Sequence, residues 1–279
     1  MKRHRVGIQG ELGAFSQEAV RQLLGDRAQV APYPTFEGVF RALRAGKIDA
    51  AVIPMENTLA GSVHENYDHL LHFDVRIAAE TNVRIIHNLI APPGIRLKDI
   101  RKVYSHPVAL NQCLRFFARH RNMESTPFYD TAGSVKMVME EKAPHAAAIA
   151  SSVAASMYGA HILQRSIEDD RRNFTRFFLL YPRKRTRLPR RQAKAWKTSL
   201  VFTTRNIPGA LFRALSAFAL RDLNMTKIES RPLHGKPWEY LFYLDFLDRE
   251  DEPRVQNALR HLAELADFMR VLGSYPKGS

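Results

Sequence analysis

Apolar stretches of strand length alternate with helix-like patterns through the first part of the chain. The expected strands cover residues 6–9, 50–54, 102–104, 124–129 and 146–150, and each leads through a small or polar turn into a helix. Four of these helices are expected to end near Leu24, His72, Lys142 and Tyr158, and a further helix, from about Phe36 to Ala45, leads into the strand at 50–54. Repeated strand, turn and helix is typical of parallel sheets with crossover helices. The first part of the chain is therefore predicted to be α/β.

The stretch at residues 173–180 is predicted to be the strand around which the other elements pack. It is almost entirely apolar, which is the composition of a strand buried on both faces. Side chains alternate along a strand, so Asn173, Thr175 and Phe177 share one face and Arg176 lies on the other. Two interpretations of Thr175 stay open here: a hydroxyl bonded to neighbouring backbone, or one that presents a proton to a substrate.

A second lobe is expected after residues 83–90, which are predicted to form a strand passing from one lobe to the other. Pro107 stands where a proline favours the first position of a helix, and Leu110 and Leu114 belong to the buried stripe of that helix. Gln112 falls about 200° from Leu110 around the helix axis. Its side chain is therefore available to solvent or to a ligand.

The pattern changes after residue 197. Strands are expected at residues 198–204, 225–231, 238–246 and 268–272, with one amphipathic helix after the first strand and another after the third. The order βαββαβ predicts a small ferredoxin-like α+β domain. The predicted division is residues 1–181, a linker at 182–197 and residues 198–279.

Charge and cysteine content narrow the class of protein. The 279 residues carry a formal net charge of +14, and the segment 182–197 contributes eight basic residues and no acidic one. Like charges and prolines predict a linker there, with a nucleic-acid-binding arm as the alternative. The single cysteine, Cys113, fits a reducing compartment and is expected in the core. Without a signal-peptide pattern or a bilayer-length apolar run, a cytoplasmic location is predicted.

Several predicted turns carry polar side chains that suit a ligand. Ser16 and Thr131 stand at helix starts, where the first backbone N–H groups have no partner and attract anions, although a plain turn is the alternative at Ser16. Glu56 and Asn57 directly follow an apolar strand, at the edge where open α/β sheets bind ligands. Several of these turns are expected to converge on one anion.

The helix predicted to end near His72 raises the question of a metal site. Ser62 and Glu65 have the spacing of a capping box, so the helix is expected to begin at Ser62. Glu65, His69 and His72 are spaced to face one another, but a solvated helix face is the preferred interpretation. No metal is expected.

Together these residues resemble the prephenate dehydratase family across nearly the whole chain. The motifs occur in the family's order: Gly10-x-x-Gly13-Ala14-Phe15-Ser16, Glu56-Asn57-Thr58 with Gly61-Ser62-Val63, Ser105-His106-Pro107 with Asn111-Gln112-Cys113, and Asn173-Phe174-Thr175-Arg176-Phe177. Thr58 stands where serine is usual, and Val108 where the family often has glutamine. Because no helical mutase region precedes Val6, the resemblance is to the monofunctional form.

The resemblance implies a two-lobed catalytic part of the periplasmic-binding-protein type, with substrate in the cleft between the lobes. It implies a carbon–oxygen lyase of phenylalanine biosynthesis that converts prephenate to phenylpyruvate, carbon dioxide and water without metal or other cofactor. By the resemblance, Thr175 donates a hydrogen bond or a proton to the departing hydroxyl, with Glu56 as a better acid that relays the proton. The implied substrate contacts are Ser16, Asn57, Ser105, Gln112, Thr131 and Arg176.

The last domain resembles an ACT domain, which implies allosteric regulation by phenylalanine. Gly209, Ala210 and Leu211 are expected to receive the carboxylate of the amino acid and Glu229 its ammonium group, together with Ser230, Arg231 and Pro232. Because ACT domains pair across subunit interfaces, a homodimer or homotetramer is expected, with neither nucleic acid nor membrane as a partner. The alternatives are arogenate dehydratase, a silent amino-acid sensor, and a DNA binder supported only by the basic linker.

Overall fold

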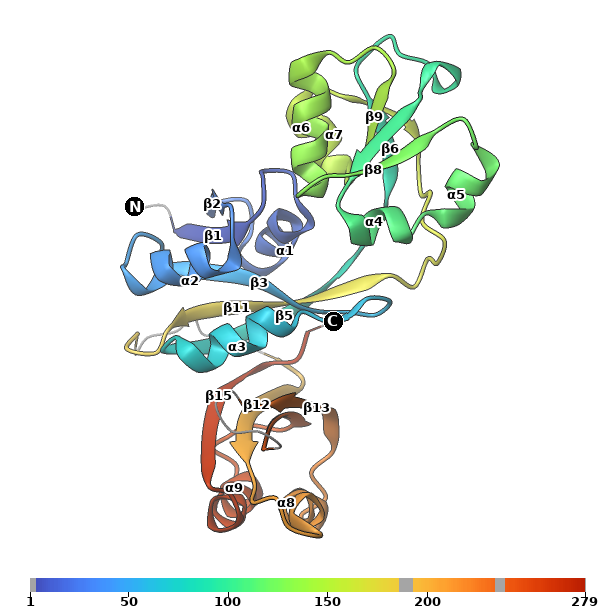
Figure 1. Ribbon diagram of the computed structural model, residues 1–279. Helices are drawn as coiled ribbons and strands as arrows, with labels where there is room; N and C mark the ends of the chain where they lie inside the picture. The colour runs from blue at the N-terminus through green and yellow to red at the C-terminus, as the bar shows by residue number, and fades with distance from the viewer. Residues whose placement is uncertain (1–3, 186–192, 234–238, 279) are drawn as a thin grey trace. The chain divides into compact units, whose positions relative to one another are not determined.

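The computed structural model describes residues 4–185, 193–233 and 239–278 (Figure 1). Residues 186–192 of the predicted linker and the turn predicted at 234–237 lie outside the described residues. The chain divides into two compact units, Met1–Phe73 with Thr81–Leu179, and Asp74–Glu80 with Leu180–Ser279. Within the described ranges, no helix combines the length and the apolar composition that crossing a bilayer requires.

The first sheet of the N-terminal unit has the strand order β2-β1-β3-β11-β5. β1 (Arg5–Gln9) runs parallel to both β2 (Gln29–Tyr33) and β3 (Ala50–Asn57). β11 (Phe174–Pro182), the strand predicted to be central, lies between β3 and β5 (Val75–Arg84). Its apolar run is buried, as the composition predicts. The helices of this lobe are α1 (Phe15–Leu24), α2 (Phe36–Arg44) and α3 (His64–His72).

The second sheet has the order β10-β6-β9-β7-β8 and is mixed. β7 runs parallel to β8 and β9, whereas β6 runs antiparallel to β9 and β10. The prediction of parallel sheets is therefore wrong for β6: the strand enters from β5 of the other sheet, so no crossover helix within its own sheet sets its direction. The strands are β6 (Asn88–Ala91), β7 (Lys102–Ser105), β8 (Glu124–Pro127), β9 (Ala146–Ala150) and β10 (His161–Gln164).

Helices pack on this second sheet and bury its apolar side chains in two clusters. Cys113 is fully buried in one cluster, as predicted for a small core residue. The helices are η1 (Leu97–Asp99), a 3₁₀ turn, and α4 (Pro107–Asn111), α5 (Leu114–Arg119), α6 (Thr131–Glu141) and α7 (Ser152–Tyr158). Two α/β lobes, each built on its own sheet, are thus present, as expected.

The strand predicted at residues 83–90 is in fact broken between β5 and β6. The Ile85 N–H donates to the carbonyl of Asn173, and the His87 N–H donates to the Glu168 carboxylate at 3.0 Å. These two backbone groups are therefore satisfied outside a regular ladder. The break leaves His87 between the two lobes.

The single helix predicted after Pro107 is also two helices. The Asp169 carboxylate accepts the N–H groups of Leu114 and Arg115 at 2.8 and 3.0 Å, which caps the start of α5 and allows the chain to turn after Gln112. Leu114 is consequently 59% exposed and is not part of the buried stripe.

The helix start predicted at Ser62 is wrong. Gly61 and Ser62 form β4, which pairs with the end of β3, and α3 begins only after Val63. Because of this pairing, β3 extends through Glu56 and Asn57, which end the strand instead of following it.

The C-terminal unit has the predicted βαββαβ order, with a four-stranded antiparallel sheet in the order β13-β14-β12-β15. α8 and α9 cover one face and close an apolar core with it. β12 starts at Trp196, inside the expected linker. The elements are β12 (Trp196–Thr203), α8 (Ala210–Ala219), β13 (Met225–Pro232), β14 (Tyr240–Leu247), α9 (Pro253–Leu265) and β15 (Phe268–Pro276).

Candidate active site

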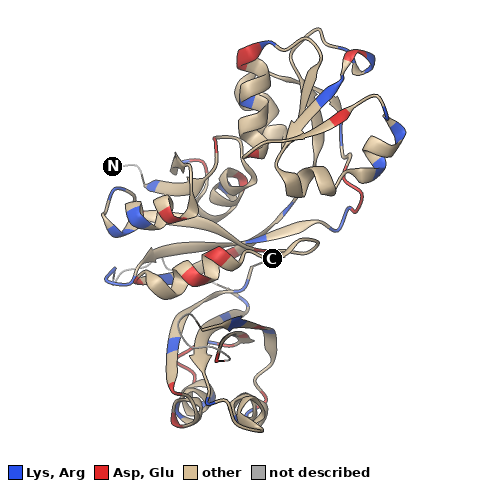
Figure 2. Ribbon diagram, viewed as in Figure 1, with Lys and Arg blue, Asp and Glu red and all other residues tan. Residues whose placement is uncertain are grey.

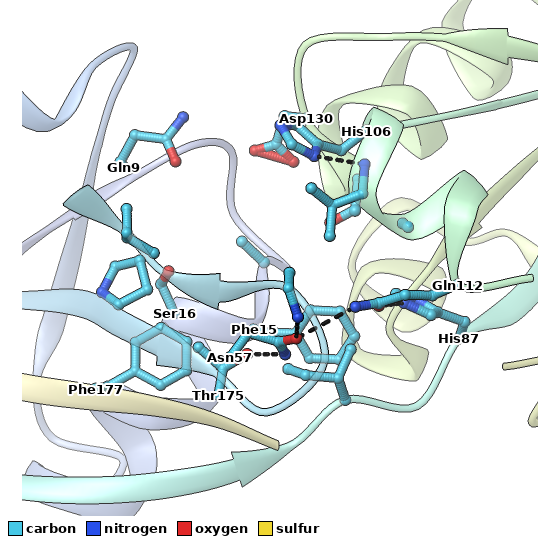
Figure 3. A pocket seen from close by; sticks show the side chains of 18 of the residues that line it. Gln9, Phe15, Ser16, Asn57, His87, His106, Gln112, Asp130, Thr175 and Phe177 are labelled. Carbon is cyan, nitrogen blue, oxygen red and sulfur yellow. Dashed lines mark hydrogen bonds between the residues drawn. The ribbon is translucent and has the colours of Figure 1, made fainter. Parts of the chain in front are cut away.

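A pocket of about 490 Å³ lies between the two lobes of the N-terminal unit (Figure 3). The first lobe contributes polar groups from the ends of β3 and β11 and the start of α1, and the second lobe contributes groups flanking α4 and α6. Five predicted site residues line it: Ser16, Asn57, Gln112, Thr131 and Thr175. The fold thus brings together in one pocket residues that are far apart along the chain.

Asn57 and Thr175 form the contact at the base of the first lobe's wall. Asn57 Nδ2 donates to Thr175 Oγ1 at 3.0 Å, and Asn57 Oδ1 accepts the backbone N–H groups of Leu59 and Ala60 at 3.0 and 2.8 Å. A backbone N–H can only donate, so the orientation of the Asn57 amide is fixed. Thr175 Oγ1 is therefore an acceptor from Asn57, and its own proton is left for another acceptor.

Asn173 and His87, which the sequence analysis did not select as site residues, complete this wall through Gln112. Gln112 Nε2 donates to Asn57 Oδ1 at 3.3 Å. Gln112 Oε1 accepts from Asn173 Nδ2 at 2.8 Å and lies 2.9 Å from His87 Nε2. Asn173 could have been found, since alternation along the strand places it on the face of Thr175. For His87 the signal is weaker: a histidine at the end of an apolar run.

His87 is buried and reaches the pocket between the lobes (Figure 3). Burial lowers the pKa of His87, against the opposing effects of its contact with Gln112 and of the Glu168 charge. The ring of Phe15 meets it edge-on, with centroids 5.9 Å apart. A neutral imidazole is therefore favoured at physiological pH.

Asp130 forms the start of α6 on the opposite wall. One carboxylate oxygen accepts the N–H groups of Ala132 and Gly133 at 2.6 and 3.1 Å, and the other accepts the N–H of Glu11 at 2.9 Å. Burial raises the pKa of Asp130, and the hydrogen bonds from these N–H groups oppose the rise. Gly10 has a φ of +93° and passes so close that a Cβ there would lie 2.1 Å from the Asp130 carboxylate. The carboxylate thereby joins the β1–α1 loop to the second lobe.

The pocket can hold an anion without lysine or arginine. None of the described residues that line it is Lys or Arg, and α4 on its wall carries no charged side chain (Figure 2). His106, whose pKa is lowered by burial and raised by the nearby Asp130, and His87 are the lining side chains able to become cationic. Amide, hydroxyl and helix-start N–H groups are therefore the main anion-binding groups available.

Three predicted site residues lie outside the pocket lining. Ser105 is fully buried and donates to the carbonyl of Ile149 at 2.6 Å, so its hydroxyl holds β7 against β9. Arg176 alternates with Thr175 on β11 and stacks over the Phe178 ring at 4.6 Å. Glu56 forms an ion pair with Arg176, with Oε2 3.9 Å from Nη1. Strand alternation thus turns both charged groups away from Thr175.

The residues weighed as a metal site on α3 form separate contacts. His69 Nε2 lies 3.2 Å from Glu65, and His72 Nδ1 lies 2.8 Å from the carbonyl of Asp68. Within the described residues, no three His, Cys, Asp or Glu side chains gather as a metal site would need.

The predicted effector residues lie on two elements of the C-terminal unit. Gly209 precedes α8 with a φ of 76°, and Ala210 and Leu211 begin that helix. Residues 229–232 lie on β13, where Glu229 pairs with Lys227 at 3.1 Å. A cavity of about 210 Å³ at the start of α8 is lined by Ala210 but, in the described part of this unit, by none of residues 229–232.

Comparison with known protein families gives two matches along the chain. Residues 6–185 match the family model for prephenate dehydratase, and residues 198–264 match that for the ACT domain. Arogenate dehydratase/prephenate dehydratase 2 of Arabidopsis thaliana is 41% identical over 98% of this chain and 73% of its own. Arogenate dehydratase 2 of Petunia hybrida is 40% identical over 99% of this chain and 73% of its own.

Solved structures agree over nearly the full length. A prephenate dehydratase from Arthrobacter aurescens in complex with L-Phe superimposes with a TM-score of 0.88 at 33% identity, covering 98% of this chain and 89% of that one. A structure described as a novel type of quorum quenching acylase gives 0.89 at 32% identity, covering 98% of both chains.

Proposed function

We propose, because this chain belongs to the prephenate dehydratase family and carries an ACT domain, that the pocket between its lobes converts prephenate to phenylpyruvate. The reaction makes the protein a carbon–oxygen lyase. The observation that carries the proposal is the direction of one hydrogen bond. Asn57 donates to Thr175 Oγ1, so the Thr175 proton is available to a substrate in the pocket. In the proposed division, the catalytic part ends near residue 181 and the ACT part begins near 198.

The chemistry requires a hydrogen-bond donor more than a strong acid. The electron pair of the bond to the departing carboxylate moves into the ring, the ring becomes aromatic, and the hydroxyl at the opposite carbon leaves with its own electron pair. One proton is taken up, so prephenate yields phenylpyruvate, carbon dioxide and water. Thr175 stabilises the charge that grows on the leaving oxygen. The proton itself comes ultimately from solvent, since a threonine hydroxyl is a poor acid.

The polar groups on both walls of the pocket are proposed to bind the two carboxylates of prephenate. Gln112 lies beside Thr175, and Ser16 and Thr131 stand at the starts of α1 and α6, where backbone N–H groups attract anions. Aromatic and aliphatic groups such as Phe15 and Phe177 exclude water around the ring. Desolvation strengthens each of these hydrogen bonds in the transition state.

The ACT domain is proposed to make the enzyme responsive to phenylalanine. The L-Phe complex of the Arthrobacter aurescens relative supports this effector. Gly209, Ala210 and Leu211 would bind its carboxylate and Glu229 its ammonium group, with residues 230–232 beside Glu229, in a homodimer or homotetramer. Calorimetry with phenylalanine tests the assignment, and unchanged binding in Glu229→Ala would remove Glu229 from it. A cytoplasmic location belongs to the same proposal.

Arogenate is the second candidate substrate. It is favoured by the names of the plant relatives, which are 38–41% identical to this chain. Arogenate differs from prephenate by an amino group in place of the keto oxygen, away from the hydroxyl that Thr175 faces. The same chemistry therefore serves both substrates.

Turnover assays with each substrate test the function. Purified full-length protein is expected to form phenylpyruvate from prephenate, and the ratio of kcat/KM for prephenate and arogenate gives its preference. Thr175→Ala is expected to lower kcat by about 10²–10⁴, while Thr175→Ser, which keeps the hydroxyl, retains most of it. Near-normal turnover in folded Thr175→Ala would remove this residue from the mechanism.

A further inference from the structure

Three side-chain amides close a ring of hydrogen bonds on the pocket wall. Asn57 Nδ2 donates to Asn173 Oδ1 at 2.7 Å, Asn173 Nδ2 donates to Gln112 Oε1 at 2.8 Å, and Gln112 Nε2 donates to Asn57 Oδ1 at 3.3 Å. Each amide donates once and accepts once, so all three could reverse together without losing a bond inside the ring. Contacts outside the ring must therefore set its direction.

Thr175 is the group whose hydrogen depends on that direction. In the observed ring, Asn57 presents its NH₂ group to Thr175 Oγ1, and the hydroxyl proton remains for the substrate (Figure 3). In the reversed ring, Asn57 would present its oxygen, and Thr175 would donate to it instead. Reversal would thus take the hydrogen bond away from the leaving hydroxyl.

At Asn57 the direction is held by groups that cannot change. The N–H groups of Leu59 and Ala60 can only donate to Oδ1, and the carbonyl of Phe174 can only accept from Nδ2, at 3.2 Å. At Gln112 the outside contact is different in kind. His87 Nε2 lies 2.9 Å from Oε1, and a neutral imidazole nitrogen either donates or accepts according to its tautomer.

The other nitrogen of His87 does not decide that tautomer. Nδ1 is buried and has no hydrogen-bond partner among the residues that the structure describes. Burial lowers the pKa of His87, which favours a ring with a single proton. A proton on Nε2 can donate to Gln112 Oε1, and this hydrogen bond in turn stabilises the amide orientation that points Oε1 at His87.

We propose that His87 is a positioning residue: as its Nε2–H tautomer it donates to Gln112 Oε1 and, together with the backbone groups at Asn57, holds the amide ring in the direction that leaves the Thr175 proton to the substrate. This inference rests on the proposed function, because the leaving hydroxyl is what receives that proton. Figure 3 shows the order of the groups, with Gln112 between His87 and Asn57, and Asn57 between Gln112 and Thr175. His87 thus acts through two other side chains and not on the substrate.

Nitrogen NMR of the imidazole rings tests the tautomer without any assay of activity. The His87 signals of the ligand-free full chain, assigned by their loss in His87→Gln, are expected to show a proton on Nε2 and none on Nδ1 near neutral pH. A proton on Nδ1 alone, or on both nitrogens, would overturn the proposal. This result stands whether or not the protein turns over prephenate, so it separates failure of the inference from failure of the proposed function.

Two substitutions test the kinetic consequence. His87→Phe keeps the ring volume and the edge contact with Phe15 but has no donor, whereas His87→Gln keeps an N–H near the position of Nε2. We expect His87→Phe to lower kcat on the order of tenfold, with KM little changed, and His87→Gln to retain most of the activity.

The Thr175→Ala background distinguishes positioning from a merely structural role. If His87 acts through Thr175, His87→Phe has no further effect on the residual kcat once Thr175 is alanine. An additional tenfold loss in that background, unchanged kcat in the single variant, or equal losses in the Phe and Gln variants would each overturn the proposal. If His87→Phe does not fold, the tautomer measurement decides.

Discussion

Replacing Asn57 with aspartate exchanges the side-chain NH₂ group, which donates to Thr175, for an oxygen. The substitution keeps the oxygen that accepts from the backbone N–H groups of Leu59 and Ala60. It places a second oxygen where Nδ2 donates to Asn173 at 2.7 Å, Thr175 at 3.0 Å and the carbonyl of Phe174 at 3.2 Å. Thr175 must then turn its proton toward the new carboxylate and away from the pocket.

The expected loss follows from those contacts. The Phe174 carbonyl cannot become a donor, so it faces a like partial charge, while Thr175 can satisfy the carboxylate only by withdrawing from the substrate. Removal of one donor from a developing oxyanion costs about 10²–10³ in kcat, or ~2.7–4 kcal/mol. We expect Asn57→Asp to lower kcat by this factor at neutral pH.

A pH profile of kcat is the sharpest assay of the reasoning. The protonated form of the introduced carboxyl can donate to Thr175 as the amide does. Activity of Asn57→Asp relative to wild type should therefore rise as pH falls. Asn122→Asp, which adds the same charge at an exposed position of the same unit, is the control. A folded Asn57→Asp enzyme with kcat within about threefold of wild type, or without recovery at low pH, would refute the argument.

Three further predictions concern stability. Gly10→Ala should lower the free energy of unfolding in urea by ~2–4 kcal/mol, since the new Cβ would meet the Asp130 carboxylate at 2.1 Å. The control is Gly25→Ala, where φ is +73° and no atom lies within 4 Å of the new Cβ, so the expected loss is only ~1–2 kcal/mol. Equal losses in the two variants would contradict the clash. Burial lowers the pKa of His87 from 6.5, so the unfolded state binds more protons and stability should fall as pH drops below 6.5 toward the folded value. His106 also has a pKa lowered by burial, but it is present in wild type and in His87→Gln alike. The Tm of His87→Gln should therefore fall less than that of wild type over this pH range. Parallel curves of Tm against pH for the two proteins would argue against a buried neutral His87. In the C-terminal unit, Lys197→Met should cost ~3–5 kcal/mol, because it removes the ammonium charge that lies 2.7 Å from the buried Glu80 carboxylate. Adding Glu80→Gln should recover part of that loss, and no recovery would show that the charge is not the cause.

The elements themselves follow closely from local pattern. The β1–α1, α2 and β9–α7 segments and the βαββαβ order of the C-terminal unit agree with periods of two and 3.6 residues, punctuated by turn residues. At two of the failed predictions, a distant group had intervened. Asp169 starts α5 and divides a predicted helix, and Glu168 takes the N–H of His87 where a strand was expected to continue.

Of the candidate site, the sequence determined the family and the motif residues, and alternation along β11 already placed Asn173 with Thr175 and apart from Arg176. It could not determine which motif residues meet. Ser105 belongs to a motif yet holds a strand, whereas His87 completes the hydrogen-bonded wall from a break between strands. Only the tertiary structure decided these roles, because the direction of a hydrogen bond between side chains depends on donors and acceptors that the fold brings together from segments more than a hundred residues apart, as in the contact of Asn57 with Thr175.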